Sequence, residues 1–101
     1  MSLVYKILPR TEWAAACAAG EFKGSGIDLE DGFIHFSAED QWRETLEKHF
    51  ASKTDLLLVA VEARALGPAL KWEVSRGGAL FPHLYGPLPT ALALSVEPVS
   101  G

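Results

Sequence analysis

Several stretches of the chain alternate hydrophobic and polar positions with a period of two, the pattern of a β-strand with one buried face. Residues 3–8, 33–37 and 70–75 show this alternation. Residues 56–62, LLLVAVE, are apolar without alternation, which predicts a central strand covered on both faces. Residues 91–98 are predicted to be a closing strand. The pattern therefore predicts five strands.

The first of two predicted helices covers residues 11–20, TEWAAACAAG. Its alanines favour a helix, and Gly20 suits the C-terminal cap because glycine readily adopts a left-handed backbone. Trp13 and Cys17 lie four residues apart and therefore share a face. Both are expected in the core, with Cys17 as a small apolar residue.

The second predicted helix covers residues 39–51 and carries an apolar stripe at helical spacing. Ser37, followed by Asp40, resembles a capping box at its start. The members of the stripe are expected to face the core, and its histidine is interpreted as structural. The stripe consists of Trp42, Leu46, His49 and Phe50.

Between the first helix and the second strand lie residues 20–32, which hold four glycines and are interpreted as a loop. The helices fall early in the chain, and the second half is almost all strand. This order predicts an α+β fold, with residues 1–101 forming a single domain.

Composition narrows the classes of function. Of the 101 residues, 49% are hydrophobic and 22% are charged, as in a globular protein. The net charge of −4, with scattered lysines and arginines, gives no basis for binding a nucleic-acid backbone. One cysteine excludes an internal disulfide. No signal peptide is evident and no apolar run is long enough to span a membrane, so a cytoplasmic location is expected.

No complete catalytic or binding motif occurs in the sequence. The stretch GSGIDL at residues 24–29 lacks the third glycine of a dinucleotide-binding fingerprint, and the three histidines do not have the spacing of metal ligands. No metal site is therefore predicted. The candidates that remain are single polar residues near the ends of predicted elements.

His35 and Ser37 share one face of the second strand. A histidine there suits proton transfer or ligand binding in a cleft, or equally a hydrogen bond to the backbone at the edge of the core. Lys6 and Glu73 are candidate ligand contacts, although an amine extending to water and a surface carboxylate are the favoured interpretations. Trp72 is expected to pack in the core.

Residues 79–89, ALFPHLYGPLP, combine three prolines with aromatic residues and a histidine. One interpretation is a rigid turn in which Phe81 and Tyr85 serve as packing. The other is a pocket wall on which His83 and Tyr85 present hydrogen-bonding groups from a stiff backbone. The two interpretations carry equal weight, and His35 and His83 are the candidate catalytic residues.

Three motifs together resemble a known family. They are VYKI at residues 4–7, DGFIHFS at residues 31–37 and LFPHLYGPLP at residues 80–89. The resemblance is to a small bacterial family of unknown function with domains of about this length. The fold of that family is similar to the catalytic core of the ADP-ribosyltransferases, which implies a small split sheet, rich in antiparallel strands, with two helices.

The resemblance also implies a place for the NAD-binding triad of the transferases. Lys6 falls at the position of their histidine, His35 at that of their tyrosine, and His83 near their catalytic glutamate. A histidine cannot supply the negative charge of a glutamate, but Glu73 could approach from the neighbouring strand. NAD is a candidate cofactor through this resemblance alone.

Two functions follow as hypotheses. The first is a cleft lined by His35, Ser37, His83 and Tyr85 that binds a small anionic or nucleotide-like ligand, with transferase or hydrolase activity open. The alternative is a non-catalytic module that uses residues 79–89 to bind a protein partner.

Overall fold

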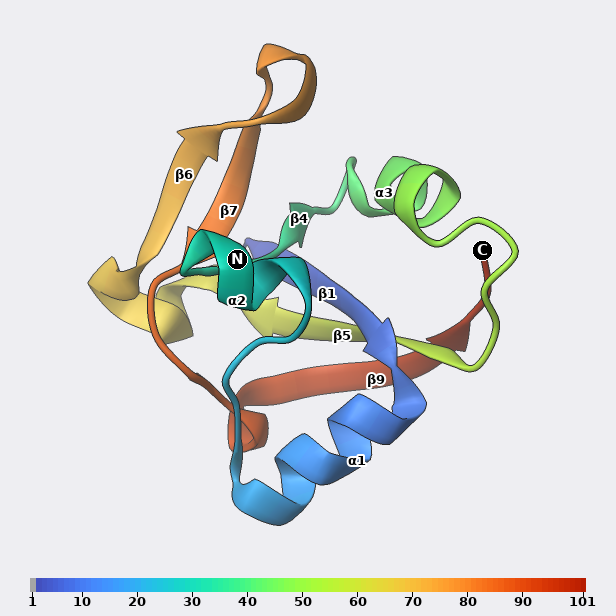
Figure 1. The fold of residues 1–101 in the computed structure, drawn as a ribbon. Coiled ribbons are helices and arrows are strands. Elements are labelled where there is room, and N and C mark those ends of the chain that lie inside the picture. Colours follow the sequence, from blue (N-terminus) through green and yellow to red (C-terminus); the bar gives the residue numbers. More distant parts are fainter. Residues whose placement is uncertain (1) are drawn as a thin grey trace.

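Antiparallel strands form three small sheets in the computed structural model, which describes residues 2–101 without the side chain of Arg76 (Figure 1). The largest has the order β4 (Ser37–Ala38), β1 (Leu3–Pro9), β5 (Leu56–Glu62), β9 (Ala93–Val99). The second has the order β3 (Ile34–His35), β7 (Leu80–Leu84), β6 (Leu70–Val74). The third pairs β2 (Glu21–Phe22) with β8 (Leu88–Pro89). The α+β class is confirmed.

Three α-helices accompany the sheets in the described part of the chain. They are α1 (Arg10–Ala19), α2 (Ile27–Asp31) and α3 (Trp42–His49). The predicted first helix is confirmed with its cap, because Gly20 has a φ of 88° and donates its N–H to the carbonyl of Cys17. Short 3₁₀ turns occupy Ala63–Ala69, Arg76–Gly78 and Thr90–Leu92.

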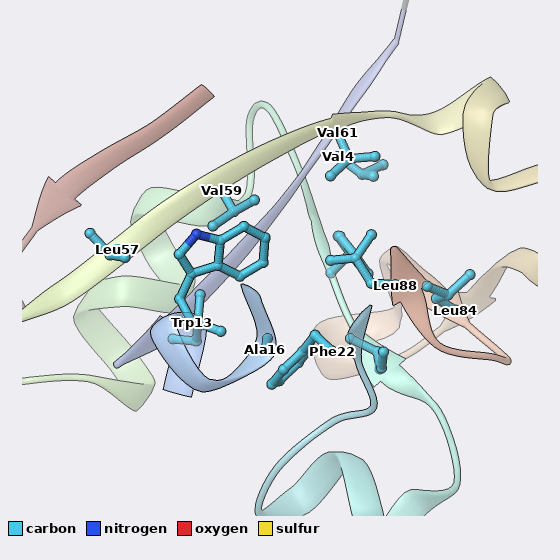
Figure 2. Close-up of a cluster of buried hydrophobic side chains, with 12 residues drawn as sticks. Val4, Trp13, Ala16, Phe22, Leu57, Val59, Val61, Leu84 and Leu88 are labelled. Carbon is cyan, nitrogen blue, oxygen red and sulfur yellow. The ribbon is translucent and has the colours of Figure 1, made fainter. Parts of the chain in front are cut away.

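The main core lies between α1 and one face of the four-stranded sheet (Figure 2). Trp13 of α1 lies against Val59 of β5, and Phe22 and Leu88 belong to the same cluster. Every residue of β5 except Glu62 is buried, and β1 and β9 flank it. The prediction that residues 56–62 form a central strand is therefore confirmed.

The other face of this sheet packs against α3 through a smaller cluster. Ile7, Leu56 and Leu58 are buried there, with Trp42 and Leu46 packed against them. No residue of α3 is itself fully buried, and His49 is exposed, so the prediction of a buried stripe was wrong for His49 and too strong for its neighbours. A helix on the rim of a small sheet has too little surface above it to cover its whole apolar face.

Two residues expected in the core lie outside it. Cys17 is exposed because α1 presents Trp13 and Ala16 to the sheet, which turns position 17 toward solvent. Trp72 is 44% exposed on the β6–β7 hairpin, which projects away from the rest of the molecule (Figure 1). Nothing covers this side of the hairpin among the described residues, so alternation in β6 did not mark a buried face.

The predicted strand at residues 33–37 is divided between two sheets. Ile34–His35 pair with β7, whereas Ser37–Ala38 pair with β1. Between them the N–H of Phe36 donates to the carbonyl of Pro82, and the Phe36 side chain is buried. This crossing brings the ends of the two sheets together.

Residues 20–32 were predicted to be a loop, but they contain α2 and β2. Residues 79–89 are likewise largely strand rather than turn, since β7 and β8 lie within them. Among residues 2–101, no helix has the length and apolar character needed to cross a bilayer.

Candidate functional site

A cavity of about 420 Å³ lies where the two larger sheets meet. Its walls come from α2, α3 and the β6–β7 hairpin, the elements that lie around β4 in Figure 1. We call it the histidine cavity. Its volume is in the range of small-ligand sites. Its polar lining includes Lys6, Asp28, Asp31, His35, Ser37 and His83, together with the hydroxyls of Ser25, Thr45 and Ser75.

Two histidines of neighbouring strands form one wall of the histidine cavity. His35 of β3 and His83 of β7 are direct partners in the antiparallel ladder, which places them on the same face. Their ring centroids are 5.5 Å apart. Both residues also line the cavity.

His35 lies between two carboxylates. Its Nδ1 is 2.6 Å from Oδ1 of Asp28, and its Nε2 is 3.0 Å from Oδ2 of Asp31. An imidazole has two N–H donors only in its protonated form, so the ring can donate to both carboxylates only as an imidazolium.

Asp28 is the centre of a buried network. Its side chain accepts hydrogen bonds from the Nζ of Lys6 at 3.0 and 3.2 Å and from the backbone N–H groups of Ser25 and His35. Asp28 and Lys6 are only 3% and 8% exposed. Asp28 is also the one buried residue of α2. This short helix is therefore attached to the fold through a carboxylate.

The network decides the ionisation of Asp28. Burial raises the pKa of a carboxyl, but here the hydrogen bond from His35 and the charge of Lys6 outweigh burial and lower the pKa of Asp28 from 3.8 to about 2. For Lys6, burial is the largest influence and lowers its pKa, while Asp28 counteracts it. Both groups are paired at neutral pH, which avoids an isolated buried charge.

Glu73 orients the second histidine. Its Oε1 is 2.8 Å from Nδ1 of His83 and accepts a hydrogen bond from the Tyr85 hydroxyl, also at 2.8 Å. These hydrogen bonds from His83 and Tyr85 lower the pKa of Glu73, and the carboxylate in turn raises the pKa of Tyr85. A carboxylate at Nδ1 fixes the proton on that nitrogen and leaves Nε2 of His83 as the basic atom.

Phe33 connects the aromatic groups. Its ring stacks on His83 with centroids 4.0 Å apart, and it also contacts His35 at 4.6 Å and Tyr85 at 5.2 Å. Phe33 is half-buried, so it shields one side of the histidine pair from water. Stacked rings of this kind limit the rotation of each imidazole.

The site residues predicted from sequence fall into two groups. His35, Ser37, His83 and Lys6 line the histidine cavity, while Glu73 and Tyr85 lie behind His83, outside the set of described residues that line it. Ser37 was wrongly interpreted as a helix cap, because its Oγ bonds the hydroxyl of Thr45 and caps no helix. Lys6 and Glu73 are not simple surface charges, because each has a specific partner.

Sequence reasoning missed Asp28, Asp31 and Phe33. The first two lie in the segment that was interpreted as a glycine-rich loop. The glycines of this segment were the available signal in the sequence. In the structure, a Cβ at position 24 would lie 2.9 Å from the Cβ of Asp28. The glycines permit close packing around a buried carboxylate, in addition to providing a loop.

Comparison with solved structures identifies close relatives. The crystal structure of protein CC0527 from Caulobacter crescentus has a TM-score of 0.91 and 56% sequence identity, covering 93% of this chain and 82% of that one. The solution NMR structure of the same protein has a TM-score of 0.87 and 54% identity, covering 97% and 84%. No curated protein matches the chain. The family described as "Protein of unknown function (DUF952)" matches residues 7–96, and the chain therefore belongs to that family.

Proposed function

We propose that the histidine cavity binds a small anionic or nucleotide-like ligand, and that His35 and His83 act on it as a general acid and a general base. The observation that carries this proposal is the pair of carboxylate-oriented imidazoles with centroids 5.5 Å apart on one cavity wall. Paired acid and base groups in different environments are a recurring arrangement in catalytic sites.

The chemistry follows from the two environments. Nε2 of His83 accepts the proton of an attacking water or hydroxyl, and the proton remaining on Nδ1 is held by Glu73. His35, as an imidazolium, donates its Nε2 proton to the departing group. In the structure, Nε2 of His35 contacts Asp31, whose side chain is 40% exposed. Because an exposed ion pair contributes little stability, a ligand can displace this carboxylate at small cost.

The nature of the ligand follows from the lining. Lys6 and an imidazolium at His35 offer charged N–H donors on the wall, where Asp28 and Asp31 balance their charge, and the hydroxyls of Ser25, Ser37 and Ser75 offer neutral hydrogen bonds. Phosphate oxygens and ribose hydroxyls are groups that such donors and acceptors recognise. A nucleotide-like ligand combines both.

Resemblance to the ADP-ribosyltransferase fold supports the same proposal. The positions compared with the transferase triad, Lys6, His35 and His83, lie around one cavity. Glu73, suggested as a source of negative charge, is 2.8 Å from His83. Transfer of an ADP-ribosyl group and hydrolysis of a phosphate ester are the two reaction classes that we propose to test.

A ligand panel tests the proposal. Thermal unfolding is followed with NAD, ADP-ribose, nucleotides, phosphorylated RNA ends and divalent metal ions, for the unmodified protein and for His35→Ala and His83→Ala. We expect stabilisation by at least one phosphate-bearing ligand, since a ligand at about a hundredfold its Kd adds about 2.7 kcal/mol. Both variants should lose this response.

One control variant tests whether a lost response is specific to the histidine pair. His49→Ala changes an exposed histidine on α3 that also lines the cavity but is not part of the acid–base pair, and it should retain most of the response. If no ligand stabilises the protein, or if the histidine variants respond as the unmodified protein does, the proposed site is wrong.

A second candidate function rests on the β6–β7 hairpin. Trp72, Val74 and Leu80 are 44%, 71% and 51% exposed there, an unusual cluster for a surface hairpin. Within residues 79–89, Phe81, Leu84 and Leu88 are buried and therefore unsuited to docking. A protein-binding module would therefore use the outer face of the hairpin, and silence of the whole ligand panel would favour it.

A further inference from the structure

A second concave surface lies beside the histidine cavity. It has a volume of about 320 Å³, and its apolar walls are formed by Leu29, Phe33, Ile34, Leu84 and Pro87. We call it the Phe33 hollow. Asp28 lines both the hollow and the histidine cavity, so the two lie on either side of α2.

From this surface we propose that the Phe33 hollow binds a planar aromatic ring that carries a single negative charge. As part of a substrate, the ring would be attached to the group that reacts in the histidine cavity; that extension rests on the proposed function, whereas binding of the ring does not.

The walls of the hollow suit a flat apolar group. The Phe33 ring stacks on His83 with centroids 4.0 Å apart, a contact that limits its rotation. Pro87 is rigid, and Ile34 and Leu84 are buried and held by the fold. Rigid apolar walls lose little conformational entropy when a ligand binds.

Gly86 leaves space open beside the hollow. At Gly86 an added Cβ would meet no atom within 4 Å, and its φ is not in the left-handed region. A side chain at position 86 would therefore be tolerated by the backbone and would enter open space beside the hollow. Glycine at this position leaves room that packing does not require.

Charge selects an anionic ring over a neutral one. Among the described residues that line the hollow, Lys23 carries the positive charge, and its side chain is 77% exposed. Its contact with Glu21 is long, at 3.6 Å, and such an exposed pair is easily exchanged for a ligand carboxylate. Asp28 does not oppose the ligand strongly, because Lys6 already neutralises it.

Phe33 also connects the hollow to the candidate catalytic groups. The same ring that lines the hollow contacts His35 and His83. A ring bound against Phe33 would therefore lie one side chain away from both imidazoles. An enzyme can bind one part of a substrate and use that binding energy for the reaction of another part nearby.

The test uses benzoate as the probe, with acetate and cyclohexanecarboxylate as matched anions that lack a planar ring. Amide resonances of the ¹⁵N-labelled protein are followed during each titration. We expect millimolar benzoate to shift the amides of Gly32, Phe33 and Gly86 with one saturation curve, and the other two anions to shift them far less. Equal shifts with acetate, or none with benzoate, would overturn the proposal.

Variants at the hollow sharpen this test. Gly86→Leu should weaken benzoate binding about tenfold or more by filling the space, while Gly86→Ala should change it little. Lys23→Glu, an exposed change that leaves the fold intact, should weaken binding severalfold. Survival of benzoate binding in both Gly86→Leu and Lys23→Glu contradicts the proposed site.

The failure of this inference is distinguishable from failure of the proposed function. Gly86→Leu should leave the response of the histidine cavity to inorganic phosphate unchanged. Ser37→Ala, at a residue that lines the histidine cavity but not the hollow, should weaken the phosphate response and leave benzoate binding in place. If the unmodified protein binds benzoate but does not respond to phosphate, the proposed site in the histidine cavity is wrong. If it responds to phosphate but does not bind benzoate, the proposed site in the hollow is wrong.

Discussion

Replacing Asp28 with asparagine is expected to destabilise the protein by about 3–5 kcal/mol, the cost of leaving one member of a buried ion pair without its partner. Lys6 would keep its charge inside the fold with no carboxylate to neutralise it. The amide of asparagine would also present donors to Lys6 and His35, which are donors themselves. Thermal unfolding should show a fall in Tm of at least about 12 °C.

Asp31→Asn is the matched control for this change. Asp31 also contacts His35, but its side chain is 40% exposed, so its removal should cost less than about 1 kcal/mol. Equal effects of the two variants would show that α2 is not held through Asp28.

Acid provides a second check on Asp28. Its pKa is lowered from 3.8 to about 2 by folding, so its contribution is complete above about pH 4 and is lost as the pH falls through 2. The difference in stability between the unmodified protein and Asp28→Asn should therefore shrink over this interval. A difference that stays constant between pH 4 and pH 2 would contradict the assignment.

Trp13→Ala is expected to cost about 3–5 kcal/mol, because it removes a large side chain from a packed core. Trp13 is 8% exposed and joins α1 to β5 in the main cluster (Figure 2). The loss removes apolar burial and leaves a cavity that the sheet cannot close. Denaturant unfolding of the purified variant measures the change directly.

The matched control is Trp72→Ala, which removes the same side chain from the exposed hairpin. Trp72 is 44% exposed, so we expect a loss of less than about 1 kcal/mol. A large loss at Trp72, or a small one at Trp13, would show that the core has been assigned to the wrong side of the molecule.

Hydrophobic patterning predicted the long strands of the main sheet well, because six or seven residues suffice to show either alternation or a continuous apolar run. Residues 3–8 and 56–62 became β1 and β5 with boundaries displaced by at most one residue. The strand at 33–37 shows the opposite case. Ile34 and Phe36 are buried on one face, as expected, yet the segment serves two sheets, and no local pattern records a change of partner.

The position of the candidate site was only partly predictable. His35 and His83 were identified because each follows bulky apolar residues in a stiff segment, and they are direct strand partners. Their carboxylates could not be assigned in advance, because Asp28 and Glu73 reach them from elements 7 and 10 residues away. Which acidic residue meets which histidine is a matter of tertiary packing.

The helix α2 shows why the rest was missed. A five-residue helix that exposes Ile27 and Leu29 and buries an aspartate has the reverse of the usual amphipathic pattern. Glycines on both sides then suggest a loop. The stabilising contact is an ion pair with β1, which sequence patterns do not display.

The central claim is that His35 and His83 form one ligand site. Imidazole resonances of the ¹⁵N-labelled protein, recorded during a titration with ADP-ribose, test it most directly. Both rings should shift along a single saturation curve, and His35→Ala should abolish the shift at His83. A shift at one ring alone, or no shift at either, would contradict it.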